Sequence, residues 1–174
     1  ISIMLTLDLQ TVPTYYQTYV KHVVDLPLME ALKSSQQSLQ KLLLSIEEQK
    51  GDFRYAPEKW SIKELVCHMM DAERIFCYRA LRFARNDKTS LHGFDENTYA
   101  PEANAHTRTL VQLAQECSHL RICTLDLFNS FTDDMLLRTG KANNTEISVL
   151  ALGYIIAGHE THHRNVMQER YLLK

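Results

Sequence analysis

Apolar side chains recur at every third or fourth position in four long segments of the chain, which is the spacing of one face of an α-helix. The segments cover residues 28–46, 61–83, 110–131 and 148–171. A shorter stretch from Pro13 to Val24 predicts one additional helix. No segment alternates apolar and polar residues between turn formers, as the strands of a hairpin would. Four amphipathic helices of this length predict an all-α four-helix bundle.

The helix ends and connections give this bundle a direction. Ser61 and Glu64 stand three residues apart ahead of an apolar run, which is the pattern of a capping box and predicts a helix start. Gly51 is expected to stop the first helix. Residues 87–106 contain turn formers without periodicity, so we expect a long connection there, and such connections are usually functional. A long crossover lets the second and third helices run parallel, which predicts an up-down-down-up bundle.

Length and composition exclude several classes of protein. The chain has 174 residues, of which 45% are hydrophobic, and this predicts one domain over residues 1–174. A net charge of −2, from 19 Lys and Arg against 21 Asp and Glu, argues against nucleic-acid binding. No apolar run approaches the roughly 20 residues that span a bilayer. The N-terminal segment is too short and too close to acidic residues for a secretory signal. We therefore expect a soluble, cytoplasmic domain without nucleic-acid or membrane partners.

The chain begins with Ile1 and not with Met, so we expect either a few preceding residues or a native start at Met4.

The cysteines and one arginine cluster receive structural interpretations. The cysteines form no CxxC pair and lie within helical patterns, so we expect free, buried thiols. They are Cys67, Cys77, Cys117 and Cys123. Arg79, Arg82 and Arg85 fall in the last turns of the second helix, where positive charge stabilises the helix dipole. Given the net charge, we favour this interpretation over nucleic-acid contact.

Three of the eight histidines stand where they can share a metal ion. His159 and His163 are four residues apart, so both project from the apolar face of the fourth helix. His68 faces inward from the second helix, about 10 Å along it from its start, and His163 lies about 12 Å from the end of its own helix. If these two helices are antiparallel with aligned ends, the three imidazoles meet. Three protein ligands with open positions are typical of catalytic zinc sites. A purely structural histidine cluster is the alternative.

The same segment also spells HExxH, from His159 through Glu160 to His163. In zinc proteases the Glu of this motif acts as general base. Here Val166 and Glu169 stand where a metzincin has Gly and His, and only 11 residues follow His163. We therefore disfavour a protease.

Three segments together resemble the DinB/YfiT-like superfamily of metal-binding four-helix bundles. They are YAPEKWSIKELVCHMMDAER (55–74), FDENTY (94–99) and SVLALGYIIAGHETHHRNVMQERY (148–171). The likeness extends more loosely over residues 12–173, and the three-histidine metal site of the family falls on His68, His159 and His163. The chain is thus identified as a DinB-like domain.

The resemblance implies a metal-dependent enzyme acting on a small molecule, either a thiol S-transferase or a hydrolase. The cofactor would be a divalent ion, zinc or nickel, with a low-molecular-weight thiol as a candidate co-substrate, and many members form homodimers. A non-catalytic metal-binding or stress-associated protein is the alternative. Whether the chain is an enzyme stays open at this point.

Several acidic positions are candidates for supporting roles. Asp71 and Glu160 are candidate catalytic residues that orient a ligand imidazole or shuttle a proton. Surface or helix-pairing roles are the alternative for both. Glu73 is expected either to serve the site or to form a buried pair with an arginine. Residues 95–97 lie in the long connection, where they are expected to cover the open face of the metal or to form an Asx turn.

Overall fold

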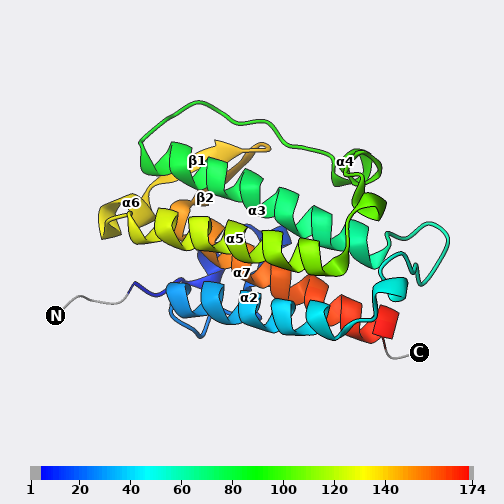
Figure 1. Cartoon of the computed structure of the whole chain (residues 1–174). Helices are drawn as coiled ribbons and strands as arrows, with labels where there is room; N and C mark the ends of the chain where they lie inside the picture. The colour runs from blue at the N-terminus through cyan, green and yellow to red at the C-terminus, as the bar shows by residue number, and fades with distance from the viewer. Residues whose placement is uncertain (1–4, 173–174) are drawn as a thin grey trace.

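Four long helices form the body of the molecule in the predicted up-down-down-up order (Figure 1). The computed structural model describes residues 5–172, so the candidate start at Met4 lies outside the described residues. The helices are α2 (Leu28–Ser45), α3 (Ile62–Ala84), α5 (Leu110–Asn129) and α7 (Val149–Val166). Helices α2 and α3 each pack against both α5 and α7, with α3 antiparallel to α7 and parallel to α5 (Figure 1). This is the pairing that the histidine spacing required. No helix within the described range is long and apolar enough to cross a membrane.

The helix ends follow the sequence signals with two exceptions. Ser61 caps α3 with the predicted capping box, because its hydroxyl accepts from the Glu64 amide and the Glu64 carboxylate accepts from the Ser61 amide. Helix α2 ends at Ser45, before the predicted stop at Gly51, and a 3-10 turn (Glu48–Lys50) occupies the intervening chain. Helix α7 passes into a π-helical turn over Met167–Leu172.

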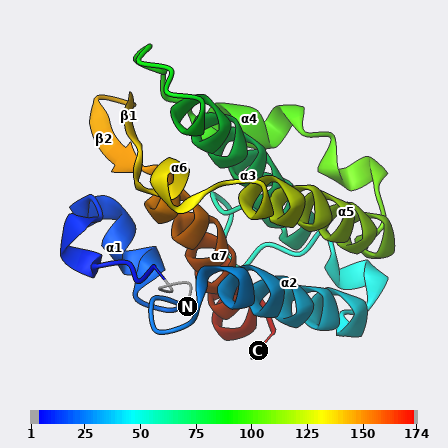
Figure 2. The ribbon, with the colours of Figure 1, turned by 90° about the vertical axis from the view of Figure 1, so that its left-hand side faces the viewer.

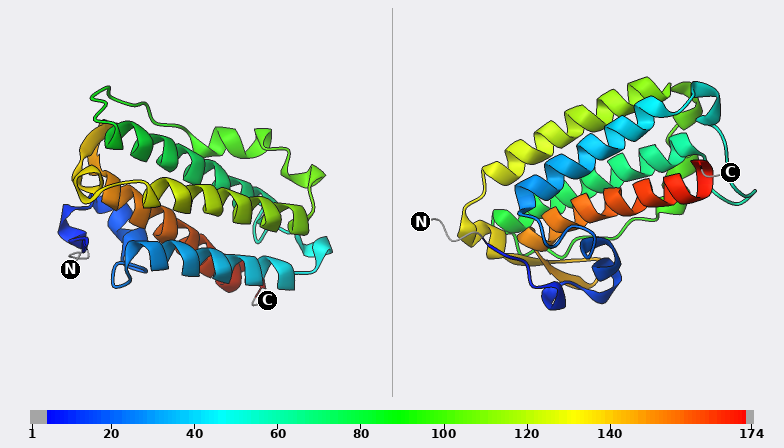
Figure 3. Two further views of the ribbon diagram at one scale, coloured as in Figure 1. Left: turned by 60° about the vertical axis from the view of Figure 1, so that its left-hand side comes forward. Right: turned by 90° about the horizontal axis from the view of Figure 1, so that it is seen from below.

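Short elements complete the fold along one side and at both ends of the bundle (Figure 1). They are 3-10 turns at Leu9–Thr11 and Ala105–Thr107, and helices α1 (Thr14–Val20), α4 (Glu96–Glu102) and α6 (Asp133–Leu137). Helix α1 and the hairpin described next lie on the same side of α7 (Figure 2 and Figure 3).

The prediction that no segment forms a strand is wrong. Strands β1 (Thr139–Ala142) and β2 (Thr145–Ser148) form an antiparallel hairpin, in which Ala142 pairs with Thr145. Its two-residue turn is Asn143-Asn144, with φ values of 49° and 60°. A type I′ hairpin turn needs such positive values, and Asn tolerates them. The alternation was missed because each strand has only four residues.

The crossover from α3 to α5 is more ordered than its composition predicts. It contains α4, and it attaches to the hairpin where the Leu91 amide donates to the Lys141 carbonyl (2.9 Å) and the Asn143 amide to the Leu91 carbonyl (3.0 Å). Figure 1 shows it returning along the full length of α3.

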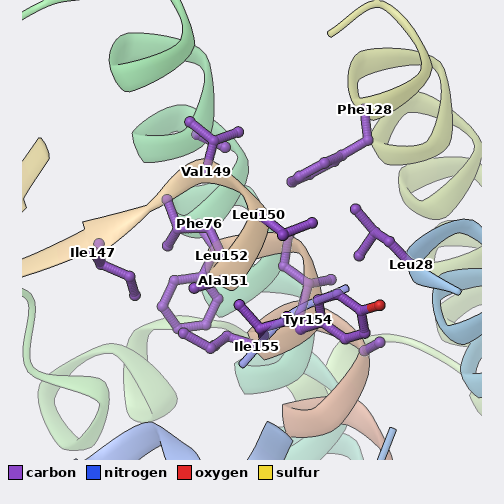
Figure 4. Close-up of a cluster of buried hydrophobic side chains, with 14 of the residues drawn as sticks. Leu28, Phe76, Phe128, Ile147, Val149, Leu150, Ala151, Leu152, Tyr154 and Ile155 are labelled. Atoms are coloured by element: carbon purple, nitrogen blue, oxygen red, sulfur yellow. The ribbon is translucent and has the colours of Figure 1, made fainter. Parts of the chain in front are cut away.

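A polar layer divides the apolar core into two clusters. One cluster gathers around the start of α7 and includes Phe76, Phe128 and Tyr154 (Figure 4). The other includes Leu39, Leu65 and Met167. Between them each long helix contributes buried polar side chains: Ser35 from α2, His68 and Glu73 from α3, Arg121 and Thr124 from α5, and His159 and Glu160 from α7.

The cysteines follow the expectation only in part. All four are free thiols, and Cys67 and Cys117 are buried. Cys77 is half-buried and Cys123 is exposed, so the prediction of burial is wrong for these two.

Candidate metal centre and cavity

The three histidines selected from the sequence meet in the polar layer. The Nε2 atom of His159 lies 3.1 Å from Nε2 of His68 and 3.0 Å from Nε2 of His163. One ligand nitrogen from each ring lies within 4.8 Å of the others. The i, i+4 spacing on α7 and the antiparallel packing of α3 against α7 together produce this convergence.

The chemistry of these three rings suits a cation. Burial lowers the pKa of His68 to about 4 and that of His163 to about 3, and it lowers the pKa of His159 well below its usual value. All three rings are therefore neutral near pH 7, the form that binds metals. Nε2 of His159 carries either one hydrogen or one lone pair. A single shared proton cannot satisfy three nitrogens, whereas a cation accepts a lone pair from each. The residues present thus fit a divalent ion with three protein ligands.

A cavity of about 390 Å³ opens beside the cluster. His68, His159 and His163 line it together with side chains from five other parts of the chain. These are Pro13, Tyr15, Tyr16 and Tyr19 at α1, Trp60 before α3, Ala72, Phe76 and Arg79 on α3, Phe94 and Glu96 from the crossover, and Asn143 and Thr145 from the hairpin. Tyrosine, phenylalanine and tryptophan rings are therefore the largest group in the wall, and the histidines supply a polar face.

Helix α1 brings a tyrosine against the histidines. The Tyr19 ring packs edge-on against His159, with 5.2 Å between ring centroids. Gly158 allows this approach because α1 and α7 touch backbone to backbone there. Burial raises the pKa of both Tyr16 and Tyr19, so their hydroxyl groups stay protonated at neutral pH.

A second cavity of about 350 Å³ lies on the other side of Trp60 and His163, which line both cavities. The Trp60 ring also lies over His68, with 4.7 Å between centroids. Trp60 thus holds one ligand ring from outside the bundle. Sequence reasoning did not single it out, although it belongs to the WSIKE segment that carries the resemblance.

Neither candidate catalytic carboxylate lines these cavities. Asp71 is half-buried on α3, 3.7 Å from Arg74. Glu160 is 5% exposed and lies 3.2 Å from Nη1 of Arg121, in the polar layer. Burial raises the pKa of Glu160, while Arg121 acts in the opposite direction. The catalytic role of Asp71 and Glu160 stays a prediction.

The buried arginine pair expected for Glu73 is confirmed. Arg121 donates from Nε and Nη2 to the two carboxylate oxygens of Glu73, at 2.8 and 2.9 Å. Thr124 donates to the same carboxylate at 2.6 Å. Glu73 therefore joins α3 to α5 beneath the histidine cluster.

The Asx turn expected in the acidic stretch of the crossover is confirmed, and two of its side chains line the cavities. Asp95 forms an Asx turn by accepting from the Asn97 amide at 2.9 Å, and it caps α4. Glu96 lines the cavity beside the histidines, and Asn97 lines the second cavity.

One cavity residue contradicts its sequence interpretation. Arg79 was expected to stabilise the C-terminal end of α3, but it is only 4% exposed and lines the cavity. Arg82 pairs with Asp87, and Arg85 is exposed, as surface residues at a helix end would be. The spacing along α3 is a sequence signal for this position of Arg79. Successive spacings of four, four and three place on one helix face the residues His68, Ala72, Phe76 and Arg79.

Comparisons with known proteins agree with this architecture. The sequence profile of the DinB superfamily matches residues 31–167. No curated protein matches the chain. Among solved structures, the fold is similar to that of YfiT from Bacillus subtilis, with a TM-score of 0.74 over 82% of each chain and 15% identity. YfiT is described as a probable metal-dependent hydrolase with an unusual four-helix bundle topology. The profile match covers all three clustered histidines and most of the sequence: the chain belongs to the DinB superfamily.

Proposed function

We propose that the protein is a metal-dependent enzyme in which His68, His159 and His163 bind one divalent ion, and that it acts as a hydrolase or a thiol S-transferase on a small molecule. The observation that carries this proposal is the convergence of three neutral imidazoles on the wall of a cavity of about 390 Å³. The description of YfiT as a probable metal-dependent hydrolase supports the hydrolase form. Thiol transfer rests on the resemblance of the motifs.

A divalent ion held by three histidines supplies a nucleophile near neutral pH, because it lowers the pKa of a water or thiol bound to it. Three protein ligands leave positions for that group, as in catalytic zinc sites. We propose zinc or nickel as the ion, since imidazole suits both.

The side chains around the histidines perform the remaining tasks. Trp60 and Tyr19 pack against His68 and His159 and fix the orientation of these rings. Phe76 and the tyrosines of α1 line the cavity with apolar surface, which binds an apolar substrate and limits the access of water. Among the described residues, Arg79 is the only arginine or lysine that lines this cavity.

The alternative is a protein that stores or senses the ion without catalysis. A storage site fills the coordination sphere with protein atoms. Within residues 5–172, the cluster of potential ligands contains three histidines and no fourth His, Cys, Asp or Glu. The adjoining cavity favours catalysis over storage.

The test is incubation of the metal-loaded protein with monochlorobimane and bacillithiol, mycothiol or glutathione, and in parallel with an activated ester in water. We expect metal-dependent conjugation or hydrolysis that is lost in His68→Ala and kept in His162→Ala, since His162 lies beside the cluster but outside it. Conjugation identifies the transferase and hydrolysis the hydrolase. Background rates with every nucleophile and both ions would favour the storage alternative.

A further inference from the structure

Arg79 places a buried positive charge in the same cavity as the histidine cluster. The residue is 4% exposed, and its guanidinium lies 5.8 Å from the centre of the Phe76 ring. Arg79 follows His68 by 11 residues on one face of α3, which separates their backbones by about 16 Å along the helix. A molecule in this cavity can therefore contact the histidine cluster at one end and Arg79 at the other.

The charge of Arg79 has no acidic partner in the part of the chain that the structure describes. Its Nη2 atom donates to the carbonyl oxygen of His92 at 3.1 Å, and the guanidinium also acts on the Tyr16 hydroxyl, where it opposes the rise in pKa that burial causes. The other buried arginine, Arg121, contacts two carboxylates. A buried charge is costly unless an opposite charge compensates it, and the guanidinium has donors left over. An anion that enters from the cavity would supply the opposite charge that Glu96, which lines the same cavity, does not bring within ion-pair distance.

The surroundings select the kind of anion. The Tyr16 ring meets the Phe76 ring edge-on at 6.0 Å, so the wall beside the guanidinium is aromatic. Glu96 also lines the cavity and adds negative charge, which disfavours a dianion such as a phosphate monoester. A planar carboxylate matches the guanidinium fork and carries a single charge.

We propose that Arg79 anchors the carboxylate of a small organic acid whose apolar body lies against Phe76 and Tyr16 and whose reactive group faces the histidine cluster. This inference rests on the proposed function for the reaction, but the anchoring itself does not require the metal. It narrows the substrate to monocarboxylates with an aromatic or aliphatic body. Arg79 is an anchoring residue that sets specificity.

The probes are phenylacetate and benzoate, each compared with its uncharged amide. Trp60 is the only tryptophan of the chain and lines both cavities, so its fluorescence reports binding in either one, calorimetry gives the affinity, and the Arg79 variants identify the cavity. Each titration is carried out on the metal-loaded protein and again after removal of the metal with a chelator. We expect the acids to bind at least about 10-fold more tightly than the amides in both forms, as a charge-assisted hydrogen-bond pair would provide.

Two substitutions at Arg79 and one matched control locate the anion. Arg79→Met should abolish the preference for the acid, whereas Arg85→Met removes the same charge from an exposed position at the end of α3 and should leave it unchanged. Arg79→Lys keeps the charge without the fork and should bind the acids several-fold more weakly than the wild type. If Arg79→Met fails to fold, Arg79→Lys still tests whether Arg79 binds the carboxylate.

Four outcomes would overturn the proposal. One is the absence of a preference for either acid in the wild type. Another is a preference for the acid in Arg79→Met that equals that of the wild type, or the same result in Arg79→Lys if Arg79→Met does not fold. Arg79 would then only bind the crossover through the His92 carbonyl. The third is a preference that disappears when the metal is removed, because the carboxylate would then bind the ion. The fourth is tighter binding of phenyl phosphate than of phenylacetate. A preference that survives metal removal in a protein without turnover would uphold the anchor and contradict the proposed enzyme.

Discussion

Gly158 and Tyr19 lie in direct backbone contact, although they belong to opposite parts of the sequence. A Cβ atom on Gly158 would stand 2.6 Å from the carbonyl carbon of Tyr19, nearer still to its oxygen, and 3.1 Å from the Val20 amide nitrogen. Only glycine lets α1 approach α7 this closely. The aromatic wall of the cavity and the packing of the Tyr19 ring on His159 both depend on this contact.

Gly158→Ala should therefore displace α1 and lower the free energy of unfolding by about 1–3 kcal/mol, the usual cost of overpacking. Urea denaturation measures the loss. Gly51→Ala is the comparison and should lose less stability, because a Cβ there meets mainly the Lys63 side chain and comes no closer than 3.1 Å to the backbone, at the Glu48 carbonyl oxygen. Equal stability of Gly158→Ala and the wild type would contradict the backbone contact.

Removing a single ligand should deplete the metal. We expect elemental analysis to find about one equivalent of zinc or nickel in the wild type and little in His163→Ala, since two imidazoles hold such an ion weakly. His162→Ala changes the neighbouring residue, whose ring lies 5.1 Å from His163 by centroids, and should keep its metal. Metal content in His163→Ala equal to that of the wild type would refute the site.

The metal-free protein should lose stability as the pH falls from about 6.5 to 5. Burial lowers the pKa of His68 to about 4 and that of His163 to about 3 in the folded state, whereas an unfolded chain has histidine pKa values of about 6.5. The unfolded state thus binds more protons than the folded state in this range, so the free energy of unfolding decreases as the pH falls.

Urea midpoints at pH 7, 6 and 5 in the presence of a chelator check this dependence. His68→Leu should show a shallower slope, and His119→Leu, at an exposed position on α5, should match the wild type. A midpoint independent of pH over this range would show that burial does not hold these rings neutral.

The buried arginine of the polar layer should be far more important for stability than an exposed one. Arg121→Met leaves the carboxylates of Glu73 and Glu160 without their shared cation, which is expected to cost about 3–5 kcal/mol. Arg74→Met breaks exposed ion pairs with Asp71 and Glu116 and should cost less than about 1 kcal/mol. Denaturation curves of the two variants test the contrast, and similar losses would contradict it.

The bundle and its histidines could be predicted from the sequence because both depend on local spacing. The capping box at Ser61 fixes the start of α3. The i, i+4 spacing on α7 places His159 and His163 on the same face of that helix. His68 meets these two rings if α3 and α7 are antiparallel with aligned ends, and the structure confirms that the two helices pack antiparallel.

The walls of the cavity could not be predicted, because they depend on contacts between distant segments. Nothing in the pattern of residues 13–24 indicates that Tyr19 packs on His159. The alternation of apolar and polar residues does not predict the hairpin, because its strands have only four residues each. The Asn143-Asn144 pair is nevertheless a usable turn signal. Arg79 carries a charge that suits a helix end; its spacing from His68 places it on the same helix face, but only the three-dimensional arrangement shows that a cavity lies along that face.

The parallel course of α3 and α5 has a consequence for how such a protein can change. Since α5 starts at the opposite end of the bundle from where α3 stops, the connecting chain must travel back along the whole molecule (Figure 1). On its way it contributes Phe94 and Glu96 to the wall of the cavity, whereas the three histidines belong to the long helices α3 and α7. Substitutions, insertions or deletions in this crossover can therefore change the shape of the cavity without moving the three histidines. One three-histidine cluster can in this way be combined with differently shaped cavities.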